Sequence, residues 1–198
     1  MDQETAKLFY VISCIALGVI IFSPTLFSVI GLPKGESYSA LWLLDSDHQI
    51  ENGTLVISPT KLYKVYLGVE NHMRNLEYYR IYVKLRQNNE ALPDEATESP
   101  SPLEPIFEYR VFLNDNETWE RESRFSIEEI SFSGDFAQIS GLSIDGNYLS
   151  VNEFVAREEQ SNDFYCQFIF ELWLLNSTTS RFQYHNRFVS LWLRLTDT

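Results

Sequence analysis

The feature that most constrains the fold of this 198-residue chain is a period-two alternation of apolar and polar side chains after residue 34. Residues 62–69 and 79–86 show it most clearly. The first run predicts one shared face for Tyr63, Val65, Leu67 and Val69. The second predicts Tyr79, Ile81, Val83 and Leu85 inward, with Arg80, Lys84 and Arg86 outward. Such alternation is typical of strands that bury one face. Further strands are predicted at 39–44, 54–58, 106–113, 117–125, 129–133, 136–144, 147–151, 164–175 and 187–195.

Strands at this spacing, without long amphipathic helices between them, predict an all-β fold, an antiparallel immunoglobulin-like β-sandwich over residues 33–198. Asp145, Gly146 and Asn147 are a signal for a tight hairpin between two of the runs. The polar stretch 152–161 fits either a short helix or a loop. We therefore expect one β-rich domain with few helical residues.

Residues 88–105 interrupt the alternating apolar pattern and contain four prolines and five acidic residues. This composition predicts an extended, Pro-rich acidic loop without a core of its own. Two interpretations stay open. The loop is either a solvated connection within the domain or a docking arm for a partner protein, since proline-fixed segments lose less entropy on binding.

A Leu-Trp-Leu triplet occurs three times, centred on Trp42, Trp173 and Trp192. In a strand, the two leucines of each triplet share one face and the tryptophan takes the other, so that both faces are apolar. Dense packing on both faces explains this pattern. The alternative is that tryptophan rings form an exposed patch for another protein or for the outer leaflet of a membrane.

Residues 8–32 contain no charged side chain over 25 positions and follow a short tail, residues 1–7. As a helix, this run would extend about 37 Å, against about 30 Å of bilayer hydrocarbon. A cleaved signal peptide is the rival interpretation, but its apolar region has about 7–15 residues and ends in small residues. We predict an uncleaved transmembrane helix that contacts membrane lipid through residues 8–32.

The flanking charges, Lys7 and Lys34, do not decide the orientation of this span. Three Asn-x-Ser/Thr triplets follow it and make Asn52, Asn116 and Asn176 candidate glycosylation sites. Together with the short tail, they predict a single-pass protein of the cell membrane with its C-terminal domain outside.

The composition excludes several classes of function. A formal net charge of -13 argues against nucleic acid as a partner, because phosphates require a basic surface. Two cysteines exclude a disulfide scaffold and a cysteine-rich zinc site. The three histidines, His48, His72 and His185, show no metal-binding spacing, and no nucleophile or phosphate-binding motif occurs. We predict no catalytic, cofactor-binding or metal-binding residues and no enzymatic activity.

Several segments together resemble an archaeal membrane-anchored family catalogued as domain of unknown function 1616. The segments that carry the resemblance are 1–26, 63–72, 79–85, 101–103, 109–113, 170–173 and 184–188. The resemblance implies an archaeal origin, one N-terminal span and a domain outside the cell. It implies no activity, because the role of the family is itself unassigned.

Three classes of function remain, and they differ in the surface that each requires. The first is an accessory or structural subunit that binds another membrane or cell-surface protein. The second is a ligand- or glycan-binding module at the cell surface, and the third is an enzyme with a carboxylate pair. We favour the first, a protein–protein interaction. Its candidate interaction residues are Trp42, Trp173 and Trp192, with His72 and His185 in segments that adjoin strands.

Overall fold

The computed structural model of the chain describes residues 3–29, 36–49, 53–158, 161 and 163–196. It divides into two compact units, residues 1–36 and residues 37–198. The first unit contains the helix α1 (Gln3–Val29), which includes residues 8–29 of the predicted span. Residues 30–32 of that prediction and the candidate acceptor Asn52 lie outside the described residues.

Among the described residues, no helix combines the length and the hydropathy that crossing a membrane requires. The transmembrane character of residues 8–32 stays a prediction.

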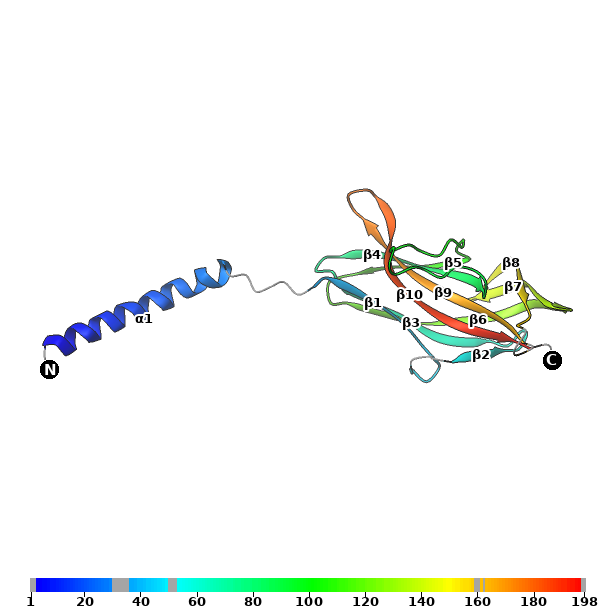
Figure 1. Cartoon of the computed structure of the whole chain (residues 1–198), viewed down its shortest axis with the longest axis horizontal. Helices are drawn as coiled ribbons and strands as arrows, with labels where there is room; N and C mark the ends of the chain where they lie inside the picture. The colour runs from blue at the N-terminus through cyan, green and yellow to red at the C-terminus, as the bar shows by residue number, and fades with distance from the viewer. Residues whose placement is uncertain (1–2, 30–35, 50–52, 159–160, 162, 197–198) are drawn as a thin grey trace. The chain divides into compact units, whose positions relative to one another are not determined.

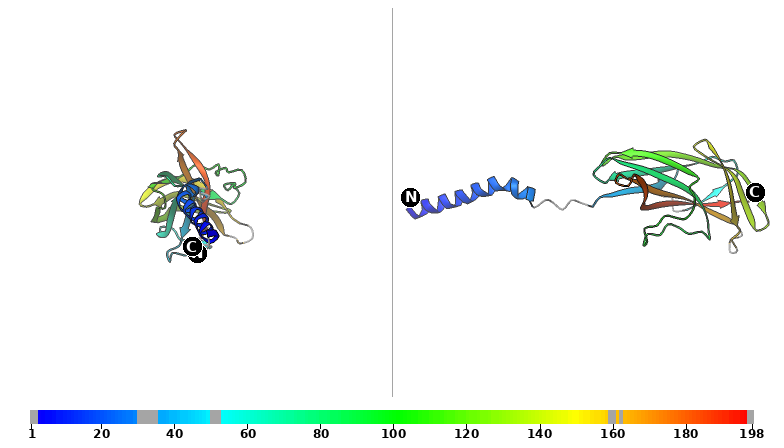
Figure 2. Two further views of the ribbon diagram at one scale, coloured as in Figure 1. Left: turned by 90° about the vertical axis from the view of Figure 1, so that its left-hand side faces the viewer. Right: turned by 90° about the horizontal axis from the view of Figure 1, so that it is seen from above.

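The second unit consists of two five-stranded sheets that pack face to face (Figures 1 and 2). Sheet A has the order β1 (Tyr38–Leu44), β3 (Tyr63–His72), β6 (Thr118–Ser133), β7 (Phe136–Ile144) and β8 (Asn147–Ala156). Sheet B has the order β2 (Thr54–Ile57), β10 (Arg181–Leu195), β9 (Phe164–Asn176), β4 (Glu77–Gln87) and β5 (Phe107–Leu113). The prediction of a mainly β chain with a sandwich-like architecture is confirmed.

The core lies between the sheets and follows the alternation of the sequence. Every apolar residue predicted to face inward in β3 and β4 is buried: Tyr63, Val65, Leu67, Val69, Tyr79, Ile81, Val83 and Leu85. The two layers meet at aromatic contacts, as where Phe125 of β6 lies edge-on to Phe168 of β9 at 5.1 Å between ring centroids. Each such side chain stabilises the fold by about 1.5–3 kcal/mol relative to exposure.

Three details of the strand prediction were wrong. Residues 117–125 and 129–133 belong to one strand, β6, in which register shifts at Ile127–Ile130 let the chain bend without leaving the sheet. The stretch 152–161 is strand as far as Ala156, because its alternating side chains continue the ladder with β7. The pair β2–β10 is parallel, since the chain between them is long enough to return in the same direction.

A chain of hydrogen bonds ties the two sheets together at one end of the sandwich. Asn71 of β3 is fully buried, and its Oδ1 accepts from the Tyr79 hydroxyl of β4 at 3.0 Å. Because Tyr79 donates there, the 2.7 Å contact with Ser39 of β1 has the serine as donor. His185 of β10 lies 3.1 Å from the same serine through Nε2, which must then carry the hydrogen. Four strands from both sheets are thereby joined by side chains.

Residues 37–198 are expected to fold without α1, because their core and this polar network lie entirely within the second unit. Circular dichroism of a fragment beginning at Ser37 should show mainly strand signal and a cooperative thermal transition. A helix-dominated spectrum, or the absence of a transition, would contradict the expectation.

Candidate interaction surface

Six aromatic side chains gather on the outer face of sheet B, away from the core. This aromatic cluster consists of Tyr78, Tyr82, Phe112, Trp173, Phe182 and Tyr184. The strand register assembles it: Tyr78 is paired with Phe112 across β4 and β5, and Trp173 with Tyr184 across β9 and β10. Residues paired in this way share a face of the sheet, so alternation alone brings their rings together.

The rings are in direct contact. Tyr78 stacks on Phe112 with centroids 4.0 Å apart and an interplanar angle of 7°, and it meets Phe182 edge-on at 5.1 Å. Trp173 lies edge-on to Tyr82 at 5.3 Å and 6.0 Å from Tyr184. Phe112 is 62% exposed, an unusually large exposure for a phenylalanine in a ring cluster.

Charged groups border the aromatic cluster on β4 and β5. The guanidinium carbon of Arg80 lies 4.0 Å from the ring centroid of Phe182, a cation–π contact. Glu108 is 3.7 Å from Arg80 and also forms a salt bridge with Arg110. Arginine and aromatic side chains are the residues enriched in the centres of protein interfaces.

The middle of the same face is covered by the Pro-rich loop, residues 88–105, seen in green between β4 and β5 (Figure 1). Arg86, only 7% exposed, holds its first part by donating to the carbonyl oxygens of Glu90 (2.7 Å) and Asn88 (3.1 Å). A third donation, to Gln167 on β9 at 3.0 Å, fixes the guanidinium to the sheet.

A buried ion pair holds the second part of the loop. Lys84 Nζ lies 2.8 Å from Glu171 Oε2, and the two side chains are 3% and 0% exposed. Lys84 also donates to the carbonyl oxygen (2.9 Å) and to the hydroxyl (3.1 Å) of Ser101, whose own N–H donates to Glu171 at 2.8 Å. Trp173 Nε1 donates to the same carboxylate at 3.1 Å. Both charges are therefore desolvated and saturated with partners.

These contacts hold parts of 88–105 against sheet B, while most residues of the loop are exposed, as in a solvated connection. Ser101 is 3% exposed and Pro93 is buried, whereas Asp94, Glu95 and Glu98 face solvent. The loop covers a charged pair on a sheet face that would otherwise be open to water. The docking-arm interpretation stays a prediction for its exposed acidic part.

The three candidate tryptophans are distributed over the two sheets. Trp42 is on the outer face of sheet A, where its Nε1 donates to Glu120 at 2.9 Å and its ring lies over Gly68. A Cβ at residue 68 would lie 2.1 Å from that ring, so only glycine fits. Trp192 shares the outer face with Trp173, but their β9 register positions differ by six residues, roughly 20 Å. The triplets place leucines inward and tryptophan outward, and no common tryptophan patch results.

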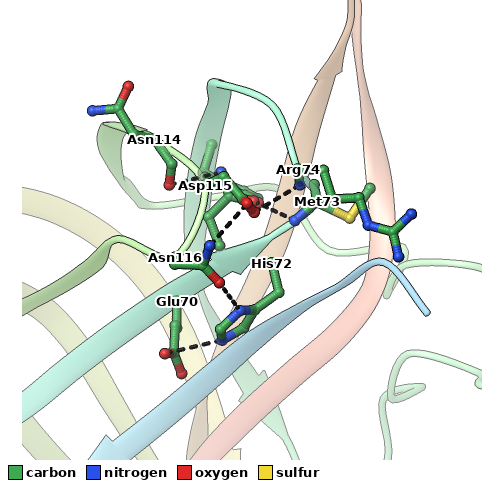
Figure 3. Close-up of polar contacts among 9 residues, drawn as sticks. Glu70, His72, Met73, Arg74, Asn114, Asp115 and Asn116 are labelled. Atoms are coloured by element: carbon green, nitrogen blue, oxygen red, sulfur yellow. Dashed lines mark hydrogen bonds and ion pairs between the residues drawn. The ribbon is translucent and has the colours of Figure 1, made fainter. Parts of the chain in front are cut away.

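His72 belongs to a polar cluster at the ends of β3 and β5 (Figure 3). Its Nδ1 lies 2.9 Å from Asn116 Oδ1, and its Nε2 lies 3.0 Å from Glu70. Asp115 accepts from the backbone N–H of Arg74 and from the Asn116 amide, each at 2.8 Å. The cluster is a network of turn contacts between two loops, and the ring of His72 is 24% exposed.

His185 lies at the same end of the sandwich, in a β10 irregularity between Tyr184 and Phe188. Both histidines reach the start of β1: His72 contacts the Tyr38 ring at 4.6 Å, and His185 contacts Ser39. Burial lowers the pKa of His185, and the nearby positive charge of Arg187 lowers it further. The two histidines therefore contact consecutive residues of β1 whose side chains lie on opposite faces, exposed Tyr38 and buried Ser39.

Of the two described candidate acceptors, Asn116 lies in a turn and Asn176 is the last residue of β9, and both use their amides in local contacts. Asn116 donates to Asp115, and Asn176 donates to Gln183 at 3.0 Å while accepting from the N–H groups of Thr178 and Thr179. Their glycosylation stays a prediction.

The described residues contain no group of three or more His, Cys, Asp or Glu side chains arranged to hold a metal ion. The one cysteine of the sandwich, Cys166, is buried, and burial raises the pKa of its thiol to about 12. A thiol of this kind stays protonated at neutral pH and is a poor nucleophile.

Comparison with protein-family models and with curated proteins gives no match to this chain. The resemblance to the domain of unknown function 1616 stays a prediction.

Sequence reasoning found one member of the aromatic cluster, Trp173, and missed the other five: Tyr78, Tyr82, Phe112, Phe182 and Tyr184. A signal was present for Tyr78 and Phe112, since each lies one position away from a buried residue in an alternating run. An aromatic side chain at an outward position marks a second apolar face, and two such positions on separate strands would have suggested a shared surface. Phe182 gave no such signal, because both of its neighbours, Arg181 and Gln183, are exposed.

Replacing Lys84 by Met should destabilise the fold by about 3–5 kcal/mol, because the carboxylate of Glu171 would stay buried without its cation. Lys64→Met is the matched control: Lys64 is 3.9 Å from Glu122 and half-exposed, so its loss should cost less than about 1 kcal/mol. Urea unfolding followed by tryptophan fluorescence measures both. Equal losses of unfolding free energy in the two variants would show that the buried pair stabilises the fold no more than an exposed ion pair does.

His185 should make the fold sensitive to mild acid. Because its pKa is lowered in the folded state, the unfolded chain binds the proton first, and stability falls as the pH drops below about 6.5. In His185→Gln, the loss of unfolding free energy between pH 7.5 and pH 5.5 should be smaller than in the unmodified chain. His48→Gln, at a half-exposed histidine, is the control. An unchanged pH dependence in His185→Gln would refute the assignment.

Proposed function

We propose that this chain is an accessory or structural subunit that binds another membrane or cell-surface protein. In this proposal, residues 8–32 anchor the chain as a single-pass protein, and residues 33–198 form an extracellular domain of the immunoglobulin-like type. The proposal includes membership of the archaeal family that the sequence resembles.

The observation that carries the proposal is the aromatic cluster beside Arg80 and Arg110. Its exposed Phe112 stacks on a ring that is itself held by Phe182, so the surface is ordered before any partner arrives. A preordered aromatic surface loses little conformational entropy on association. Aromatic and arginine side chains also account for most of the binding energy in protein interfaces.

The charge of the chain and its proposed anchor add to this support. A net charge of -13 favours a partner that carries a basic patch, with an association rate that falls as salt is added. Confinement to a membrane raises the effective concentration of the two partners, so that a weak interface stays occupied.

Cross-linking in intact source cells, followed by purification in mild detergent, tests the proposal. Phe112→Ala should reduce recovery of the partner at least fivefold, the equivalent of about 1 kcal/mol. Phe136→Ala is the control, because Phe136 is similarly exposed, at 54%, but lies on sheet A. Equal recovery with both variants, or no partner with the unmodified chain, would reject the aromatic cluster as a binding surface.

The proposed topology makes a separate prediction. Protease added to intact cells should digest residues 37–198 and leave an N-terminal fragment in the membrane. Protection of the domain until the cells are lysed would place it on the inner side.

A further inference from the structure

The strand β8 (Asn147–Ala156) forms one edge of sheet A, and no strand of the described residues pairs with its free side. A free edge presents unpaired backbone N–H and C=O groups and is a template for another strand. Natural proteins usually protect such edges with lysine, proline, a short length, a bulge, an inward-pointing charge or a covering segment. The sequence of β8, NYLSVNEFVA, contains no lysine, arginine or proline. Its one charged side chain, Glu153, lies on the inner face, where it accepts from Gln87 of β4 at 3.5 Å.

The other described edges differ from β8. The edge strand β2 has four residues, and β5 carries Glu108 and Arg110 on its outer face. The edge strand β1 is tied to sheet B where Ser39 meets Tyr79 and His185. With ten residues, β8 is the longest of the four edge strands in the described part of the chain.

Apolar surface remains exposed on both faces of this edge. On the outer face, Tyr148 is 56% and Phe154 is 46% exposed. On the inner face, Leu149 and Val151 pack against the core but are only partly buried. The register with β7 shifts between Ile139 and Gly141, yet inner and outer side chains alternate along the whole of β8.

We propose that β8 pairs antiparallel with β8 of a second copy of this chain, about a two-fold axis at Val151. The interaction goes beyond the proposed function and uses a different surface from the aromatic cluster. An antiparallel pair of identical strands is compatible with a two-fold axis, which is the commonest symmetry of protein dimers. The two copies of sheet A would then form one continuous sheet.

The register follows from the side chains. With Val151 opposite its own copy, Tyr148 faces Phe154 and Ser150 faces Asn152 of the second copy. All four outer side chains are uncharged, so the pairing places no like charges opposite each other and brings aromatic rings together across the strands. On the inner face, the partly exposed Val151 side chains meet each other, and Leu149 faces Glu153 of the second copy.

Light scattering of the full chain, purified in detergent, measures the protein mass. The expected value is twice the 23.1 kDa of one chain. Lysine at two exposed outer positions, Ser150→Lys with Asn152→Lys, places like charges across the axis and should give a single chain. Ser131→Lys is the control, since Ser131 is an exposed outer-face residue of β6, away from the edge. A single-chain mass for the unmodified protein would overturn the proposal.

Cysteine cross-linking keeps the proposal falsifiable even if the lysine variant fails to fold. In a Cys14→Ser chain, Val151→Cys should form a disulfide-linked dimer under mild oxidation, because directly opposite residues have Cβ atoms about 4.5–5.5 Å apart. Leu149→Cys should not, since its copy would lie about four residues along the ladder, roughly 14 Å away. No dimer with Val151→Cys, or equal yields at the two positions, would overturn the register. Loss of partner recovery in Phe112→Ala is independent of both results.

Discussion

The ammonium of Lys84 and the carboxylate of Glu171 meet 2.8 Å apart on a face of sheet B that points away from the core. Two charges out of water are costly unless each has further partners. Ser101 supplies them with its hydroxyl, its carbonyl oxygen and its N–H. The covered part of the outer face depends on this arrangement, since removal of the Pro-rich loop would leave the pair without those hydrogen bonds.

The outer face of sheet B consequently has two regions. The region beneath the loop is charged and buried from solvent, whereas the region beside the loop is aromatic and partly exposed to solvent. Trp173 links the two parts, because its ring belongs to the aromatic cluster while its Nε1 donates to Glu171. A binding surface that shares a side chain with the buried network is held in place by the fold, which suits recognition of a partner without prior rearrangement.

The two proposed binding surfaces are physically distinct. The aromatic cluster offers side chains, and a partner that fits it is recognised by ring contacts and charge. The free edge of β8 offers backbone groups, and only an extended strand satisfies them. The two surfaces lie on different sheets, so one chain can use both at once.

The sequence by itself determined most of the strands and, for β3 and β4, which side of the strand is buried. Alternation with a period of two requires only the local geometry of an extended backbone, and for this reason the inward faces of β3 and β4 were predicted correctly. It failed at 152–156, where the inward position Glu153 is charged and the outward position Phe154 is apolar, the reverse of the usual alternation. Bulges in β6 and the parallel direction of β2 also left no clear mark in the local pattern.

Tertiary structure alone decided what covers the outer faces and which loops meet. Ser101 binds Glu171 across 70 residues of chain, and His185 binds Ser39 across 146. Contacts at such separations depend on sheet order and strand register, which a single sequence does not specify. The candidate residues His72, His185 and Trp173 could therefore be named from the sequence, whereas the aromatic cluster around Trp173 and the free edge of β8 required the assembled sheets.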